Sequence, residues 1–223
     1  MNIGWFIGLA GGSIVFFIAS LIASMANYKN RFKDKYDFRN HFPYEFNYGS
    51  TFSLNILGNV LFLLSLAFSA GLYILTSSVI ITNGYITYSL IAGTLFSIFA
   101  GTMMFVSLKN LKLHLILSVF LYGLAFATPA AIGLGAFSVF QQTRQAYPLV
   151  IFIVCMVFGF SAFIFVMNPK LSLNIKMQKA VDPNGQEVYV RPKFINVAFT
   201  EWVMIFELFI CHILLILALI AIL

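Results

Sequence analysis

Hydrophobic residues fall into six long runs that short polar stretches separate. A helix needs about 20 apolar residues to cross the roughly 30 Å of hydrocarbon in a bilayer. A lone strand in lipid would leave its backbone groups unpaired, so each run should be a helix. The pattern therefore predicts an all-α fold, a single transmembrane domain over residues 1–223 with six helices in one bundle. The predicted spans are 3–25, 52–75, 88–107, 113–140, 147–167 and 202–223.

The composition agrees with a membrane protein and excludes other classes. The chain has 223 residues, of which 61% are hydrophobic and only 9% are charged, whereas about 25% of the residues in a soluble domain are charged. The net charge of +6 does not indicate nucleic-acid binding, because the basic residues lie between the apolar runs, where orientation signals belong. Both cysteines, Cys155 and Cys211, lie inside apolar runs, so a disulfide framework is not expected.

The basic residues are segregated between alternate loops. Twelve of the thirteen lie in the loops after the first, third and fifth spans, and only Arg144 lies in another loop. Loops that are rich in lysine and arginine face the cytoplasm. We therefore expect a multi-pass integral membrane protein with both termini on the extracytoplasmic side.

The first of these basic loops is also aromatic. Tyr28, Phe32 and Tyr36 recur every fourth residue, as one stripe of a helix would. One interpretation is a surface-lying helix that contacts anionic lipid headgroups. The other is a continuation of the first span that ends in an orientation signal. The residues expected to contact headgroups are Lys29, Arg31, Lys33, Lys35 and Arg39.

Two loops carry signals of a short β-hairpin. In 76–87, Asn83-Gly84 lies between β-branched and aromatic residues, which is typical of a primed hairpin turn. A plain helix–loop–helix link is the alternative there. In 176–191, Asp182-Pro183-Asn184-Gly185 has proline and glycine where a tight turn needs them.

Three spans carry small residues at every fourth position, which allows close helix packing in lipid. These ladders serve either to pack the bundle internally or to contact a second copy or a larger membrane complex. Their members are Gly4, Gly8 and Gly12; Gly93, Ser97 and Gly101; and Gly123, Ala127, Ala131 and Gly135.

Polar residues gather toward the cytoplasmic half of the spans. Trp202 should mark the cytoplasmic interface, with Glu201 in the headgroup region. Glu207 and His212 then lie well inside the last apolar run, where an ionisable residue is costly and usually faces the bundle interior or water. Structural roles are the alternative: Glu207 would anchor the helix at the interface, and His212 would bond to a backbone carbonyl. Four further candidates for one polar cavity lie at similar depth, namely Ser20, Asn55, Asn59 and Thr102.

No catalytic motif is recognisable, so the sequence does not favour an enzyme, and we expect neither a cofactor nor a bound metal. The leading hypothesis is a small channel or transporter for a small solute or ion, with a cytoplasm-facing polar cavity around Glu207. The alternative is a non-catalytic accessory or assembly subunit of a larger membrane complex. The expected partners are the lipid bilayer with its anionic headgroups, and a second copy or other membrane subunits, but no nucleic acid.

The charge segregation predicts which loops a reagent can reach. In a cysteine-free background, a single cysteine at position 33, 109 or 179 should react with a membrane-impermeant maleimide only after the cells are permeabilised. A cysteine in place of Arg144 should react in intact cells and serves as the control. Labelling of position 33 or 179 in intact cells would refute this topology.

Overall fold

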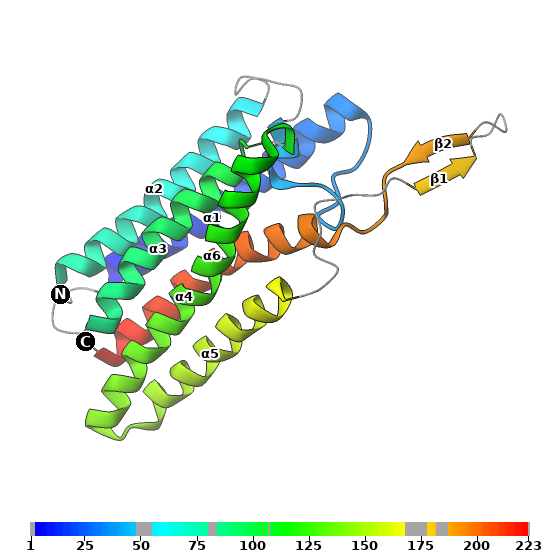
Figure 1. Cartoon of the computed structure of the whole chain (residues 1–223). Helices are drawn as coiled ribbons and strands as arrows, with labels where there is room; N and C mark the ends of the chain where they lie inside the picture. Colours follow the sequence, from blue (N-terminus) through cyan, green and yellow to red (C-terminus); the bar gives the residue numbers. More distant parts are fainter. Residues whose placement is uncertain are drawn as a thin grey trace.

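Six long helices make up most of the molecule (Figure 1). The computed structural model describes residues 3–47, 55–79, 84–106, 108–167, 178–181 and 187–222. Each of the six helices is long and apolar enough to cross a membrane, which confirms the predicted all-α bundle and an integral, multi-pass membrane protein. They are α1 (Gly4–Phe32), α2 (Ile56–Val79), α3 (Gly84–Met103), α4 (Leu111–Thr143), α5 (Ala146–Val166) and α6 (Asn196–Ile222).

Several helices extend beyond the apolar runs of the sequence. Helix α1 continues past residue 25 to Phe32, and α6 begins at Asn196, before the apolar run that starts at 202. Hydropathy marks only the segment in hydrocarbon, whereas the helical backbone continues through the polar interface until a residue leaves helical geometry. Lys33 and Arg144 do this after α1 and α4, with positive φ angles of 57° and 58°. The first basic loop therefore begins as a continuation of the first span, the second of the two interpretations.

The two predicted hairpins have different outcomes. Strands β1 (Gln178–Val181) and β2 (Glu187–Val190) pair in antiparallel register, with Gln178 opposite Val190. This hairpin projects from the helix ends (Figure 1), and its turn lies outside the described residues. In 76–87 the hairpin alternative was wrong, because α2 reaches Val79 and α3 already begins at Gly84. A helix forms its backbone hydrogen bonds within its own segment, so it needs no pairing with a neighbouring strand. Two successive helices can therefore be joined by a short link.

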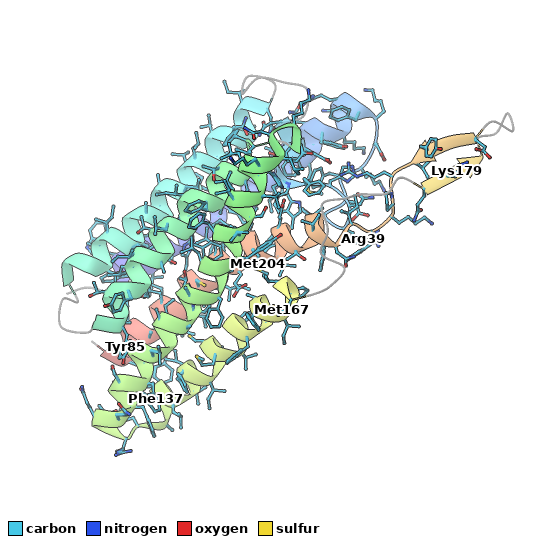
Figure 2. The ribbon with its side chains drawn as sticks, viewed as in Figure 1. Arg39, Tyr85, Phe137, Met167, Lys179 and Met204 are labelled. Atoms are coloured by element: carbon cyan, nitrogen blue, oxygen red, sulfur yellow. The ribbon has the colours of Figure 1, made fainter. Side chains whose placement is uncertain are left out.

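The bundle has two distinct ends. Helix α1 begins and α6 ends at one end, and the end of α1 and the starts of α4 and α6 lie at the other, together with the described parts of the basic loops (Figure 1). Arg39 and Lys179 accordingly lie far from Tyr85 and Phe137 (Figure 2). Helix α6 packs against α1, α3, α4 and α5 and is the most enclosed span, with 61% of its apolar window buried. Helix α5 is at the edge of the bundle, with only 22% of its window buried.

Helix α1 does not bury its glycine ladder. Gly4 and Gly8 are exposed, and a Cβ added at Gly8 would meet no atom within 4 Å. Gly12 of that ladder does lie against another helix, at the ring of Phe68. A strict four-residue spacing advances about 40° round the helix at each step, so the ladder leaves the face on which it begins. The buried face alternates spacings of three and four: Phe6, Ala10, Ser13, Phe17, Ser20, Ser24 and Tyr28.

The ladder of α3 faces α2. Gly93 lies against the ring of Tyr73, the Ser97 hydroxyl lies 2.7 Å from that of Ser69, and Gly101 lies against Leu66. These three positions let the backbones of α2 and α3 approach closely, as small residues do between helices in membranes.

The ladder of α4 divides between three surroundings. Gly123 is exposed, Ala127 and Ala131 are half-buried, and Gly135 lies against Ile86 of α3. The close approach of α4 to α5 uses two glycines outside the predicted ladder. A Cβ at Gly133 would lie 2.8 Å from the Cβ of Cys155, and one at Gly159 would lie 3.2 Å from the carbonyl oxygen of Phe126.

The contact at Gly133 predicts an asymmetry between two glycines of one helix. Gly133→Ala places a methyl group 2.8 Å from the Cβ of Cys155, which cannot move without its helix, so we expect a loss of about 1–3 kcal/mol in stability. Gly123→Ala is the control, because its methyl group meets nothing within 4 Å. Its thermal midpoint in detergent should stay the same or rise. An unchanged midpoint for Gly133→Ala would contradict the close approach of α4 and α5.

Candidate functional site

Helix α6 carries the ionisable side chains of the bundle interior. Glu201, Glu207 and His212 are all buried, and they follow one another from the basic-loop end toward the middle of the helix. Successive residues are separated along the helix axis by roughly 9 Å and 8 Å, from a rise of 1.5 Å per residue. The sequence analysis selected Glu207 and His212, but placed Glu201 in the headgroup region.

Residues 33–47 form a cap that covers this series of side chains at the basic-loop end of the bundle. Trp202, which was expected to mark the lipid interface, is buried beneath the cap, and its indole nitrogen donates to Tyr36 Oη and to the His41 carbonyl, both at 3.0 Å. The Tyr36 hydroxyl in turn donates to the Phe42 carbonyl at 2.7 Å. Burial, with a further contribution from Glu45, raises the pKa of Tyr36 well above its ordinary value, so it remains a neutral hydroxyl that can donate and accept.

An ion pair fastens the cap to the segment that leads into α6. The Arg191 guanidinium donates two hydrogen bonds to the Glu45 carboxylate, at 2.8 Å and 3.0 Å. The Ile195 amide also donates to the Arg39 carbonyl at 2.8 Å. A forked arginine–carboxylate pair restricts geometry more than a lysine would, so it fixes the cap relative to the start of α6.

A buried pair of ionisable groups lies under the cap. His114 Nε2 of α4 lies 2.8 Å from Glu201 Oε1, and neither side chain is exposed. His114 Nδ1 lies 2.9 Å from the Val106 carbonyl, which can only accept, so Nδ1 carries a hydrogen. The 2.8 Å contact is then satisfied by imidazolium with carboxylate or by neutral imidazole with carboxylic acid. The two forms have the same total charge and differ only in the position of one proton.

Ser118 adds a hydroxyl to this pair without making a catalytic triad. Its Oγ lies 3.1 Å from Glu201 Oε1 and 2.9 Å from the His114 carbonyl oxygen. In a serine triad the histidine stands between the serine and the carboxylate, whereas here the carboxylate stands between the other two. His114 therefore cannot take the proton of Ser118. The other carboxyl oxygen, Glu201 Oε2, is buried and has no hydrogen-bond partner among the described residues.

His212 belongs to a second chain of polar groups, deeper in the bundle. Its Nε2 lies 2.8 Å from the Ser69 hydroxyl, which lies 2.7 Å from the Ser97 hydroxyl, and Ser97 donates to the Gly93 carbonyl. His212 thus joins α6 to α2 and α3. Its Nε2 contacts a side-chain hydroxyl and not the backbone carbonyl that the structural alternative expected. Its Nδ1 is buried and has no partner within the described part of the chain.

Glu207 lies between these two groups, near the midpoint of the series. Its exposed fraction is 3%, and its Oε1 has no hydrogen-bond partner in the ranges that the structure describes. Its neighbours in sequence are Phe206 and Leu208, so no charged group adjoins it along the chain. This carboxyl group does not extend to the interface as a helix anchor would, since its side chain is buried and Trp202, nearer the end of α6, is buried as well.

The other cavity candidates form a separate cluster between α1 and α2. Asn55 Nδ2 donates to Ser24 Oγ at 2.9 Å, and Asn59 Nδ2 donates to the side-chain oxygen of Asn47 in the cap at 2.9 Å. The Ser20 hydroxyl donates to the Gly58 carbonyl at 2.7 Å. The sequence grouped these residues by expected depth, and depth does not specify which helix a side chain meets.

The remaining predicted site residues have local surroundings. The Thr102 hydroxyl donates to the Phe99 carbonyl of its own helix. Asp37 holds Arg39 in a forked pair at 2.7–3.0 Å, and these hydrogen bonds lower the pKa of the Asp37 carboxyl. Arg31 donates to the Phe46 carbonyl of the cap. Lys29, Lys33 and Lys35 are exposed, and contact between these basic residues and lipid headgroups stays a prediction.

The described histidines, cysteines and carboxylates are scattered through the bundle. They contain no group of three or more His, Cys, Asp and Glu side chains that could hold a metal ion. Cys155 and Cys211 are free and buried. Comparisons with protein-family models, with curated proteins and with solved structures found no match, so the site must be interpreted from its own geometry.

Sequence reasoning missed the pair of His114 and Glu201, although a signal was present. Both residues lie near the first turn of a helix that starts at the basic-loop end, since α4 begins at Leu111 and α6 at Asn196. Two helices that start at the same end and pack together place such residues at similar depth. The polar residues grouped by depth from the sequence did not include His114.

The buried pair predicts that removing one partner destabilises the protein more than removing both. Glu201→Met leaves His114 buried without the acceptor at its Nε2, so we expect the free energy of unfolding to fall by about 3–5 kcal/mol. The double variant Glu201→Met/His114→Leu removes both polar groups, and it should recover most of that loss. Unfolding in mixed detergent micelles measures both. The single variant His114→Leu completes the comparison. A double variant whose loss of stability equals the sum of the losses in Glu201→Met and His114→Leu would show that the pair is not coupled.

Proposed function

We propose that this protein is a small membrane transporter that moves a solute or ion together with a proton, with α6 as its proton-handling helix. The observation that carries the proposal is a series of buried polar atoms on α6 that have no hydrogen-bond partner among the described residues: Glu201 Oε2, Glu207 Oε1 and His212 Nδ1. Buried polar atoms are nearly always hydrogen-bonded, so those without a partner call for an explanation. A path that water, a proton or a solute enters during a transport cycle would supply the missing partners.

The spacing of these groups supports a proton path along α6. The three residues are roughly 8–9 Å apart along the axis, and all three are acids or bases. Chains of Asp, Glu and His within spans are typical of proton relays in pumps and transporters. Glu201 and His114 already share one proton across a 2.8 Å contact, and His212 continues into the hydroxyls of Ser69 and Ser97.

The cap gives this path a gate at the basic-loop end. Phe38 of the cap packs against Trp202 and Phe206 of α6, and the three ring centroids are 4.9–5.9 Å apart. A solute entering from that end must displace the cap. The hydrogen bonds of Trp202 and the pair of Arg191 and Glu45 are the contacts to be broken, and a closed gate with specific contacts suits an alternating cycle better than an open pore.

The second candidate function is an accessory subunit of a larger membrane complex. It is favoured by the outward face of α1, where Gly4 and Gly8 are exposed and an added Cβ at Gly8 meets no atom. Small residues on a lipid-facing surface allow another helix to approach closely. Within this function the buried groups of α6 would only hold the bundle together.

Substitution of Glu207 distinguishes the two functions. In proteoliposomes under an imposed membrane potential, with a pH-sensitive dye inside, Glu207→Gln should fold normally and lose proton flux, because the amide cannot release a proton. Glu187→Gln is the matched control, since that carboxylate is exposed on β2 and pairs with Lys179 in the hairpin. Its flux should equal that of the wild type. Wild-type flux in Glu207→Gln from mildly acidic to mildly alkaline pH would remove the transport proposal in favour of the accessory subunit.

A further inference from the structure

The proton path along α6 has a gap that its own side chains cannot close. Glu201 and Glu207 are separated along the helix axis by roughly 9 Å, from a rise of 1.5 Å per residue. A proton passes between two groups only across a hydrogen-bond contact of about 2.6–3.2 Å, or through one water. A group from a neighbouring helix is therefore needed between the two carboxyl groups.

Tyr122 of α4 is placed to meet this need. It follows His114 and Ser118 at four-residue spacing, so the three buried side chains lie on one face of α4. The first two of them contact Glu201 Oε1, at 2.8 Å and 3.1 Å. That face is therefore turned toward α6, and Tyr122 lies on it one turn deeper in the bundle.

The Tyr122 hydroxyl lies in the interval between the two carboxyl groups. Helices α4 and α6 both start at the basic-loop end (Figure 1), and the contact of His114 with Glu201 sets their relative depth. From that contact, the backbone of Tyr122 lies roughly 12 Å deeper and that of Glu207 roughly 9 Å deeper. Aromatic side chains lean back toward the start of their helix, which brings the hydroxyl toward Glu201. Glu201 is accordingly the acidic group that interacts electrostatically with it.

The facing atoms on α4 and α6 lack hydrogen-bond partners. Tyr122 Oη and Glu201 Oε2 are both buried, and neither makes a hydrogen bond with a described residue. Buried polar groups that the protein leaves unpaired are typically satisfied by an internal water, which needs two to four polar partners. The phenol and the carboxyl oxygen provide two such partners. Glu207 Oε1, which also has no partner within the described ranges, lies next along the path.

We propose that an internal water binds between the Tyr122 hydroxyl and Glu201 Oε2, and that Tyr122 positions this water to pass protons between Glu201 and Glu207. The passage of protons rests on the proposed transport function. The binding of the water does not, because an internal water can occupy the same site in a protein that moves no protons. In this role Tyr122 is a positioning residue, and the wall of the path opposite α6 belongs to α4.

The transfer breaks one O–H bond for each that it forms. With the pair of His114 and Glu201 as imidazolium and carboxylate, Glu201 Oε2 accepts a proton from the water. The water takes the phenolic proton of Tyr122 in the same step, and the phenolic oxygen takes the proton of the Glu207 carboxylic acid. Glu207 ends as a carboxylate and Glu201 as a carboxylic acid, while the water and the phenol end as they began. The same chain in reverse returns the proton to Glu207.

Radiolytic labelling of the full-length protein in nanodiscs tests the water site. A brief X-ray exposure makes hydroxyl radicals from water, and radicals formed at a bound water oxidise the side chains beside it. We expect oxidation at position 122, located by peptide mass spectrometry, to exceed that of Phe62, which is also buried but packs against the ring of Phe17. Equal oxidation of Tyr122 and Phe62 in the wild type would overturn the water site.

Tyr122→Phe tests whether the hydroxyl holds the water. The ring stays and remains reactive toward the radical, so oxidation at position 122 should fall to the level of Phe62 when the water is lost. A general loosening of the bundle would raise oxidation instead, which separates loss of the water from damage to the fold. Unchanged oxidation at position 122 would show that the hydroxyl does not hold the water, and the role of Tyr122 would be overturned.

Proton flux in proteoliposomes tests the passage of protons. Tyr122→Phe should lower the flux roughly tenfold, the effect of losing one strong hydrogen bond. Tyr88→Phe is the matched control, since that ring is exposed on α3, and its flux should equal that of the wild type. Full flux in Tyr122→Phe together with lost flux in Glu207→Gln would overturn the role of Tyr122 and leave the transport proposal standing. A wild type without flux would remove both, and the labelling would still decide the water site.

Discussion

A polar atom in hydrocarbon must find its hydrogen-bond partner inside the protein, because lipid offers none. This constraint organises the interior of the bundle. Hydroxyls of Ser20, Ser65 and Ser97 donate to backbone carbonyls, and the Asn55 amide spans α1 and α2. The ionisable side chains of α6 depend on other helices for their partners. Glu201 pairs with His114 of α4, and His212 pairs with Ser69 of α2. The position of α6 amid the other spans follows from that need as much as from its apolar surface.

The cap shows how a polar loop can share the same interior. Residues 33–47 are basic and aromatic, but their aromatic side chains turn inward, and Tyr36 and Phe46 stack with ring centroids 4.0 Å apart. Phe42 and Tyr44 approach the His114 ring at 5.9 Å. The buried pair beneath is thereby shielded from water, which strengthens the interaction between its charged or dipolar forms. The basic side chains of the same loop stay at the surface, so one short segment serves both interior and interface.

Much of the fold could be predicted from the sequence, because span length and loop charge are set by the bilayer itself. The six spans follow from apolar runs alone, and the hairpin at 178–190 follows from turn residues. The helix ends were misplaced where polar residues such as Lys29 continue a helix outside hydrocarbon. The outward position of Gly8 and the cluster around Asn55 could not be predicted, because depth and spacing do not specify which neighbour a helix face meets. Trp202 was expected at the lipid interface because it stands at the start of an apolar run. It is buried instead because the cap folds over it, and no simple sequence pattern predicts that inward turn.

The pairing of α4 with α6 has a consequence for biosynthesis. His114 precedes Glu201 by 87 residues, so at about 5–20 residues per second the ribosome needs roughly 4–17 s to supply the second partner. Ser69 precedes His212 by 143 residues and waits longer still. The early spans therefore enter the bilayer with polar groups whose partners have not yet been made. The bundle reaches its final arrangement only when the last helix is inserted.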